Sequence, residues 1–140
     1  ACQRGRYRFV ESSLRELAGY RMERAKEMLS AAEDNLKIGQ YKTSLNRSYY
    51  AIFHAMRAMN ILKGFDSSKH SGVIAYFNKE YIKEGIMDKE LSVIIKSCSF
   101  LREKSDYDDF FIVGRKETEN QLASAKVFLE AVEKYLTEKE

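Results

Sequence analysis

The chain contains no proline in its 140 residues. Because no proline ring removes a backbone donor or clashes with the preceding turn, helices can extend along the whole chain. The apolar residues recur at spacings of three and four, which is the period of an amphipathic helix. In the first such segment they are Ala18, Met22, Ala25, Leu29, Ala32 and Leu36. The sequence therefore predicts an all-α fold without strands.

Glycines and polar runs divide this pattern into separate helices. Gly39 is placed where a left-handed residue closes a helix, and Gly64 follows the second periodic segment. The loop at Gly39 is so short that the helices on either side of it must be antiparallel. We expect an antiparallel bundle of four to five helices. The first four helices are predicted at about residues 13–38, 41–62, 71–83 and 88–104. Residues 105–114 form a connection, and the last helix runs from there to the end of the chain.

Composition narrows the class of protein. The longest apolar stretch, residues 49–62, is interrupted by His54, Arg57 and Asn60, so we expect no membrane segment and no secretory signal, and a cytoplasmic protein. Two cysteines are too few for a disulfide framework, and a net charge of +3 neither requires nor excludes an RNA partner. We expect residues 1–12 to be a disordered arm or a cloning remnant, ahead of one helical domain over residues 13–138.

The segment over residues 41–62 has two different faces. Its core face is predicted to hold Leu45, Tyr49, Ile52, Met56 and Met59. Arg47 lies near the opposite side, and His54 returns to within roughly 20° of it, about 10 Å further along the axis. Small residues accompany this pair, namely Ala51, Ala55 and Ala58, together with Tyr50. Such a face is suited to close contact with a second helix, either a neighbour in the bundle or the same helix of a second subunit.

Arginine and histidine together fit metal-independent cleavage of RNA. Histidine titrates near neutral pH and can take the proton from a 2′-hydroxyl, while the planar guanidinium of arginine can hold the phosphate. The pair also has a structural interpretation. In that interpretation His54 is a hydrogen-bonded residue at a helix contact, and Arg47 pairs with a carboxylate, for which Glu33 and Asp34 across the short hairpin are the candidates.

Three separated motifs resemble one protein family. They are NRSYYAIFHAMRAM from residue 46, KHSGVI over residues 69–74 and LREKSDYDDF over residues 101–110. Together with the order of the helices, they resemble a prokaryotic branch of the HEPN family over roughly residues 20–137. The motif shared by that family is an arginine, four to six residues and then a histidine, and here Arg47 and His54 enclose six.

The resemblance implies a fold, an assembly and an activity. It implies a HEPN-like helical bundle that forms a homodimer through the helix over residues 41–62, so that two motifs face one cleft. Many members are metal-independent endoribonucleases that act as toxins beside a nucleotidyltransferase-like antitoxin. On this resemblance Arg47 contacts the scissile phosphate of an RNA substrate, and His54 is the general acid or base.

Departures from the family pattern concern the residues around this pair. Active members often have Asn, Asp or His directly after the arginine, whereas this chain has Ser48 there and Asn46 before it. A tyrosine that the antitoxin modifies with AMP in some members is replaced by Met56, so that modification is not carried over. Asn46, Ser48 and Tyr50 are retained as candidate binding residues.

Two further groups of polar residues are possible sites. Lys69 and His70 begin the helix expected over residues 71–83, where free amide groups can receive a phosphate, and we keep both as binding candidates. The acids Asp106, Asp108 and Asp109 lack the spacing of a calcium loop. We therefore expect no metal and no cofactor.

Three functions from different classes remain open. The first is a HEPN ribonuclease toxin. The second is a non-catalytic HEPN module that binds nucleotide or RNA, or docks a nucleotidyltransferase partner. The third is a structural interaction domain in which Arg47 and His54 are buried in pairs within one chain.

Overall fold

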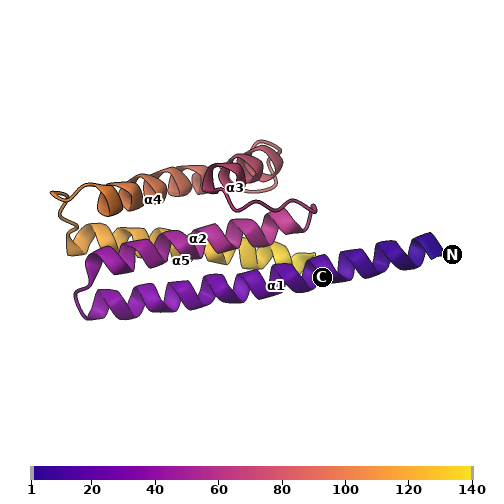
Figure 1. Ribbon diagram of the computed structural model, residues 1–140, viewed down its shortest axis with the longest axis horizontal. Coiled ribbons are helices and arrows are strands. Elements are labelled where there is room, and N and C mark those ends of the chain that lie inside the picture. Colours follow the sequence, from indigo (N-terminus) through magenta and orange to yellow (C-terminus); the bar gives the residue numbers. More distant parts are fainter. Residues whose placement is uncertain (1, 140) are drawn as a thin grey trace.

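The computed structural model is an elongated bundle of antiparallel helices (Figure 1). It describes the backbone of residues 2–139 and the side chains of residues 10–139. The described residues form no strand, which confirms the all-α prediction. The elements are α1 (Cys2–Lys37), α2 (Tyr41–Ile61), α3 (His70–Phe77), the π-helical turn η1 (Asn78–Ile82), α4 (Glu90–Tyr107) and α5 (Arg115–Glu138).

Helices α1 and α2 form the antiparallel hairpin that the short loop predicted. Gly39 adopts a φ of 79°, which is open to glycine without the strain that a side chain would add. Its amide donates to the carbonyl of Leu36 at 3.1 Å, and the next amide, of Gln40, donates to Asn35 at 2.8 Å. These bonds satisfy the last carbonyls of α1 and turn the chain directly into α2.

Helix α2 is the central element and is packed against α1, α3, α4 and α5. Its predicted core face is buried as expected, with Leu45, Tyr49, Ile52, Met56 and Met59 each at most 2% exposed. Phe77 of α3 and Phe128 of α5 pack against each other in the same core, with ring centroids 5.6 Å apart. The position of α2 at the centre explains why its sequence is so apolar.

The helix ends differ from the predicted ones at two places. The helix expected to begin near residue 13 is continuous from Cys2, and whether residues 1–12 act as a separate arm remains a prediction. Helix α4 continues to Tyr107 instead of ending near residue 104. An ion pair across one turn, from Arg102 to Asp106 at 3.1 Å, supports the additional turn.

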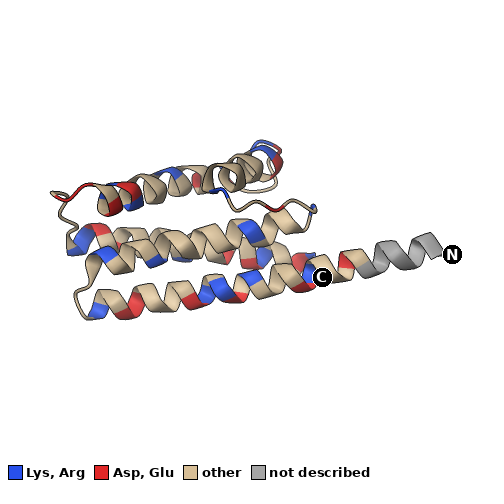
Figure 2. Cartoon of the chain, viewed as in Figure 1, with Lys and Arg blue, Asp and Glu red and all other residues tan. Residues whose placement is uncertain are grey.

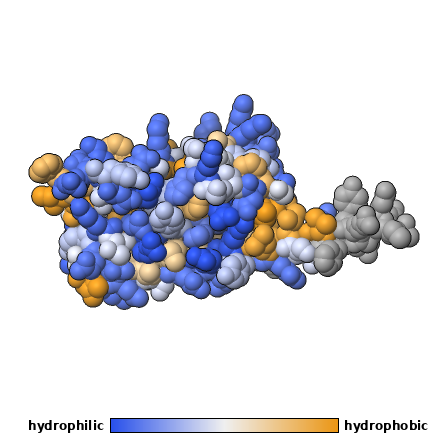
Figure 3. Space-filling model, in the orientation of Figure 1, coloured by the Kyte–Doolittle hydropathy of each residue, from blue (hydrophilic) through white to orange (hydrophobic). Residues whose placement is uncertain are grey.

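Basic and acidic residues are interspersed along α1, α4 and α5 (Figure 2), and apolar side chains are exposed near the ends of the bundle (Figure 3). Phe110 and Ile112, in the connection between α4 and α5, are 93% and 85% exposed. Within the described residues, no helix combines the length and the apolar character that crossing a membrane requires.

Candidate functional site

One stripe of α2 reaches solvent. Between residues 44 and 61 every side chain is buried except those of Asn46, Arg47, Tyr50, His54 and Arg57. The last four recur at spacings of three, four and three, so they lie along one face of the helix. We call these five residues the polar stripe. Helix α2 contains no acidic residue, and the charges of the stripe are therefore all positive.

The alanine face of α2 is covered within the single chain. Ala51, Ala55 and Ala58 have no exposed surface and belong to the core that includes Ala18 and Met22 of α1. Of the two partners considered for this face, the structure selects the neighbouring helix. The alanines therefore give no reason to expect a second subunit, and a homodimer through α2 stays a prediction that rests on the family resemblance.

Arg47 is held without a carboxylate. Its Nη2 and Nε atoms donate to Oδ1 of Asn46 at 2.6 and 3.1 Å, and its Nη1 atom contacts the sulfur of Met28 at 3.4 Å. The prediction that Glu33 or Asp34 pairs with Arg47 was wrong for the described side chains, since Glu33 pairs instead with Lys126 of α5. The guanidinium charge of Arg47 therefore remains available to an anion.

Tyr50 stands between Arg47 and His54. The guanidinium carbon of Arg47 lies 5.5 Å from the centroid of the Tyr50 ring, and the centroid of the His54 ring lies 6.3 Å from it. Within one chain the two predicted catalytic groups thus share a surface but are separated by an aromatic ring.

His54 is half-buried and surrounded by arginines. Burial lowers its pKa most, and the charges of Arg24, Arg57, Arg21 and Arg47 lower it further, to about 4. The imidazole is therefore neutral at neutral pH, which is the form that accepts a proton. The site pairs a neutral base with several fixed positive charges.

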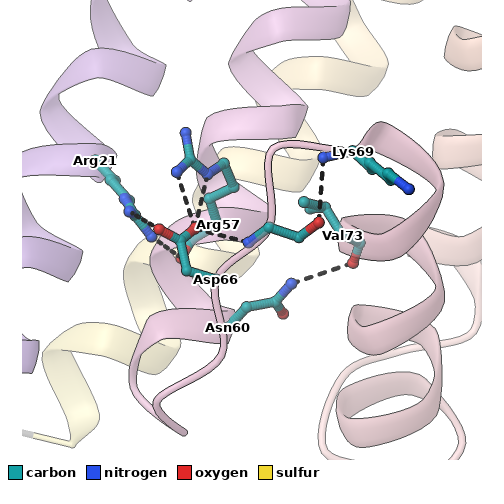
Figure 4. Close-up of polar contacts among 7 residues, drawn as sticks. Arg21, Arg57, Asn60, Asp66, Lys69 and Val73 are labelled. Atoms are coloured by element: carbon teal, nitrogen blue, oxygen red, sulfur yellow. Dashed lines mark hydrogen bonds and ion pairs between the residues drawn. The ribbon is translucent and has the colours of Figure 1, made fainter.

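Asp66 joins the arginines of two helices (Figure 4). Its carboxylate, in the linker after α2, accepts from Arg21 of α1 at 2.9 Å and from Arg57 of α2 at 2.8 Å. Arg21 also donates to the carbonyl of Arg57 at 3.3 Å, which ties α1 to α2 directly. Partial burial of Asp66 raises its pKa, but the hydrogen bonds from Arg57 and Arg21 outweigh this and lower it overall. Arg21 and Arg57, two of the four arginines around His54, thereby share one carboxylate, and the three groups together keep a net charge of +1.

The other predicted binding residues differ in whether their side chains reach solvent. Asn46 and Tyr50 belong to the polar stripe, whereas Ser48 is fully buried in the single chain, and a binding role for Ser48 stays a prediction. Lys69 is exposed and precedes α3, where its amide donates to Ser67 at 3.1 Å (Figure 4). His70 is bonded through Nδ1 to the hydroxyl of Tyr49 at 2.8 Å. This bond makes His70 a link between α3 and α2.

The family of the chain follows from comparison with known proteins. The sequence model of the HEPN domain family matches residues 18–135, which include the whole polar stripe. The chain belongs to the HEPN domain family. The prediction drawn from the three motifs is thereby confirmed.

Relatives of this HEPN chain cover most of its length. A UPF0332 protein of Thermotoga maritima is 35% identical over 84% of this chain and 89% of its own. Two proteins of Methanocaldococcus jannaschii carry the names "Putative toxin MJ0142" and "Putative toxin MJ0605". They are 33% and 32% identical over 84% and 92% of this chain, and over 80% and 96% of their own lengths.

The fold recurs in a solved structure. The crystal structure of TT1696 from Thermus thermophilus superposes with a TM-score of 0.71 over 84% of this chain and 96% of that one. The two sequences are 21% identical, so this likeness concerns the HEPN fold alone.

Sequence reasoning missed four residues of the site. Arg57 lies within the quoted motif and continues the spacing of Arg47 and His54, so the helical period could have identified it. Arg21, Arg24 and Asp66 come from α1 and from the linker, and only the packing of α1 beside α2 brings them to His54. No local pattern marks them.

The pKa of His54 can be measured directly, because the chain contains only two histidines. We expect the imidazole signals of His54 in a nuclear magnetic resonance titration to have a midpoint near pH 4, well below the ordinary value of 6.5. Between these two values the unfolded chain binds a proton that the folded chain does not, so the free energy of unfolding falls as the pH drops through this window. His54→Gln identifies the signals and removes this loss. A midpoint near 6.5 would contradict the described environment.

Proposed function

We propose that this HEPN chain is a metal-independent endoribonuclease that acts in the cytoplasm as the toxin of a pair with a nucleotidyltransferase-like antitoxin. Arg47 holds the scissile phosphate, and His54 takes the proton from the 2′-hydroxyl. The proposal is carried by the polar stripe, in which a half-buried histidine with a lowered pKa lies among arginines on the face of α2 that reaches solvent. The names of the two Methanocaldococcus relatives support the assignment to a toxin.

The chemistry requires both kinds of group. Attack by a 2′-hydroxyl on the adjacent phosphorus forms a 2′,3′-cyclic phosphate and breaks the bond from phosphorus to the 5′-oxygen. The reaction needs a base to accept the proton of the 2′-hydroxyl, a proton from the imidazolium so formed or from water for the leaving 5′-oxygen, and a cation to stabilise the charge that develops on the phosphate oxygens. A neutral imidazole accepts the proton, and a guanidinium forms two parallel hydrogen bonds to phosphate oxygens. Neither step calls for a metal ion.

The working unit in this proposal is a homodimer. Within one chain Arg47 and His54 both lie beside the ring of Tyr50. In the proposed dimer a second copy faces the polar stripe, so that the arginine of one chain reaches the histidine of the other. Sedimentation of the pure protein at micromolar concentration is expected to show a species of twice the 16.3 kDa chain mass. A 16.3 kDa species alone, at concentrations where RNA is cleaved, would refute the dimer.

The direct test is cleavage of single-stranded RNA by the purified protein in the presence of EDTA. We expect cleavage of RNA and none of a DNA of the same sequence, because DNA lacks the 2′-hydroxyl that attacks. One fragment should end in a 2′,3′-cyclic phosphate and the other should begin with a 5′-hydroxyl. Cleavage that requires a divalent metal, or that also cuts DNA, would contradict the mechanism.

A second candidate function is a non-catalytic module that binds RNA or nucleotide, or docks a nucleotidyltransferase partner, through the same stripe. The separation of Arg47 from His54 by Tyr50 favours it, because binding needs the positive charges but not their joint contact with one phosphate. Tight binding of RNA without cleavage in EDTA or in magnesium would select this function.

A further inference from the structure

Helix α1 brings a second arginine to His54. Two contacts fix how α1 lies beside α2, since Met28 touches Arg47 and Arg21 donates to the carbonyl of Arg57. The helices are antiparallel, so Arg24, between Met28 and Arg21 on α1, lies opposite the part of α2 between Arg47 and Arg57, where His54 is found. The charge of Arg24 agrees with this placement, because after burial it does most to lower the pKa of His54.

The guanidinium of Arg24 has no carboxylate partner among the described side chains. Among arginines with described side chains, Arg21 and Arg57 pair with Asp66, Arg102 pairs with Asp106, and Arg115 pairs with Glu119. Those without a carboxylate partner in the described part of the chain are Arg15, Arg24 and Arg47, and Arg24 is exposed. Two unneutralised guanidiniums therefore flank His54, one from each helix.

An exposed aromatic ring accompanies Arg24. Tyr20 precedes it by four residues, so both side chains lie on the same face of α1, about one turn apart. The Tyr20 side chain is 62% exposed, so much of its ring faces solvent. Proteins commonly bind single-stranded nucleic acids with a cation that contacts the phosphate backbone and an aromatic ring on which a base stacks. Arg24 and Tyr20 offer these two groups side by side.

We propose that Arg24 and Tyr20 form a second nucleotide subsite beside the polar stripe, which takes the phosphate and the base next to the cleaved linkage of a single-stranded RNA. This inference rests on the proposed function, since it assigns a further contact to the same substrate. The strand then crosses from α2 to α1, with one phosphate on Arg47 and a neighbouring one on Arg24, and a base stacks on Tyr20.

The test measures binding apart from cleavage. A labelled single-stranded RNA with 2′-O-methyl riboses, which lacks the attacking hydroxyl, is titrated with the full chain at several salt concentrations. Arg24→Gln is expected to weaken binding about five- to tenfold and to reduce the slope of log affinity against log salt by about 0.7, the value for one phosphate contact. Tyr20→Ala is expected to weaken binding about tenfold without changing that slope.

Arg15→Gln is the matched control, because Arg15 is an exposed arginine of the same helix that also lacks a carboxylate partner among the described side chains. The substitution removes one positive charge, as Arg24→Gln does, but at a position that is not beside His54. It should change the affinity for RNA less than twofold. Equal weakening by Arg24→Gln and Arg15→Gln would overturn the subsite in favour of general attraction. If the variants show the expected binding pattern but wild type cleaves no RNA, the proposed nuclease function fails, and Arg24 and Tyr20 stand only as an RNA-binding subsite without a cleaved linkage. If wild type cleaves RNA and Arg24→Gln binds as wild type does, only the subsite fails.

Discussion

Replacing His54 with glutamine is expected to lower the rate of metal-independent RNA cleavage by about 10²- to 10⁴-fold, the usual loss when a general acid or base is removed. Glutamine fills similar space on the half-buried face and keeps a polar end, but it cannot take up a proton in this pH range. Because the imidazole is neutral in the folded chain, the variant should retain or gain stability in mild acid. Loss of activity therefore would not reflect unfolding.

Arg47→Gln is expected to lower the same rate by about 10²- to 10³-fold, because the charge that stabilises the phosphate in the transition state is lost. Arg47→Lys should recover little of it, since an ammonium group lacks the planar fork that binds two oxygens at once. Rates are compared in EDTA on one RNA, with folding followed by circular dichroism. Unchanged cleavage by folded His54→Gln or Arg47→Gln would show that the chemistry lies elsewhere.

Mixing the two inactive variants tests whether the site is shared between chains. In a homodimer in which Arg47 of one chain serves His54 of the other, a mixed dimer of His54→Gln and Arg47→Gln chains contains one intact pair. Mixing should therefore restore a measurable fraction of the wild-type rate. No recovery in a preparation shown to exchange subunits would place both groups of the site in one chain.

Asp66→Ala is expected to lower the free energy of unfolding by about 2–3 kcal/mol, a large effect for one linker residue. Its carboxylate neutralises Arg21, whose side chain is only 10% exposed, and bonds Arg57 of the next helix. Without the Asp66 carboxylate, the largely buried guanidinium of Arg21 loses its counter-charge. An unpaired buried charge lowers the free energy of unfolding by more than the ion pair had contributed to it. The midpoint of urea unfolding measures the change.

The interpretation of Asp66 depends on controls that separate charge from linker structure. Asp109→Ala removes an exposed aspartate in another connection and should change stability by less than about 0.5 kcal/mol. Replacing Arg21 with methionine removes the group that Asp66 is said to neutralise, so Asp66→Ala should cost much less in that background. Equal costs in both backgrounds would mean that Asp66 acts through the linker alone.

The sequence by itself determined the fold class and the central pair. Five helices, the hairpin at Gly39 and the buried face of α2 followed from the helical period and from the absence of proline, because those features act within a few residues of each other. The same period placed Arg47 and His54 on the side of α2 that reaches solvent. The motifs also identified the HEPN family, which the comparison confirmed.

Only the tertiary structure decided what surrounds that pair. Whether the alanines of α2 met other helices of the chain or a second subunit depended on how the helices pack, and the alanines are buried in the core of the single chain. Packing likewise brought Arg24 beside His54 and set Asp66 between Arg21, which is 45 residues away along the chain, and Arg57, which is 9 residues away. Charges interact through space and not along the chain, so the electrostatics of His54 become defined only when the helices are assembled.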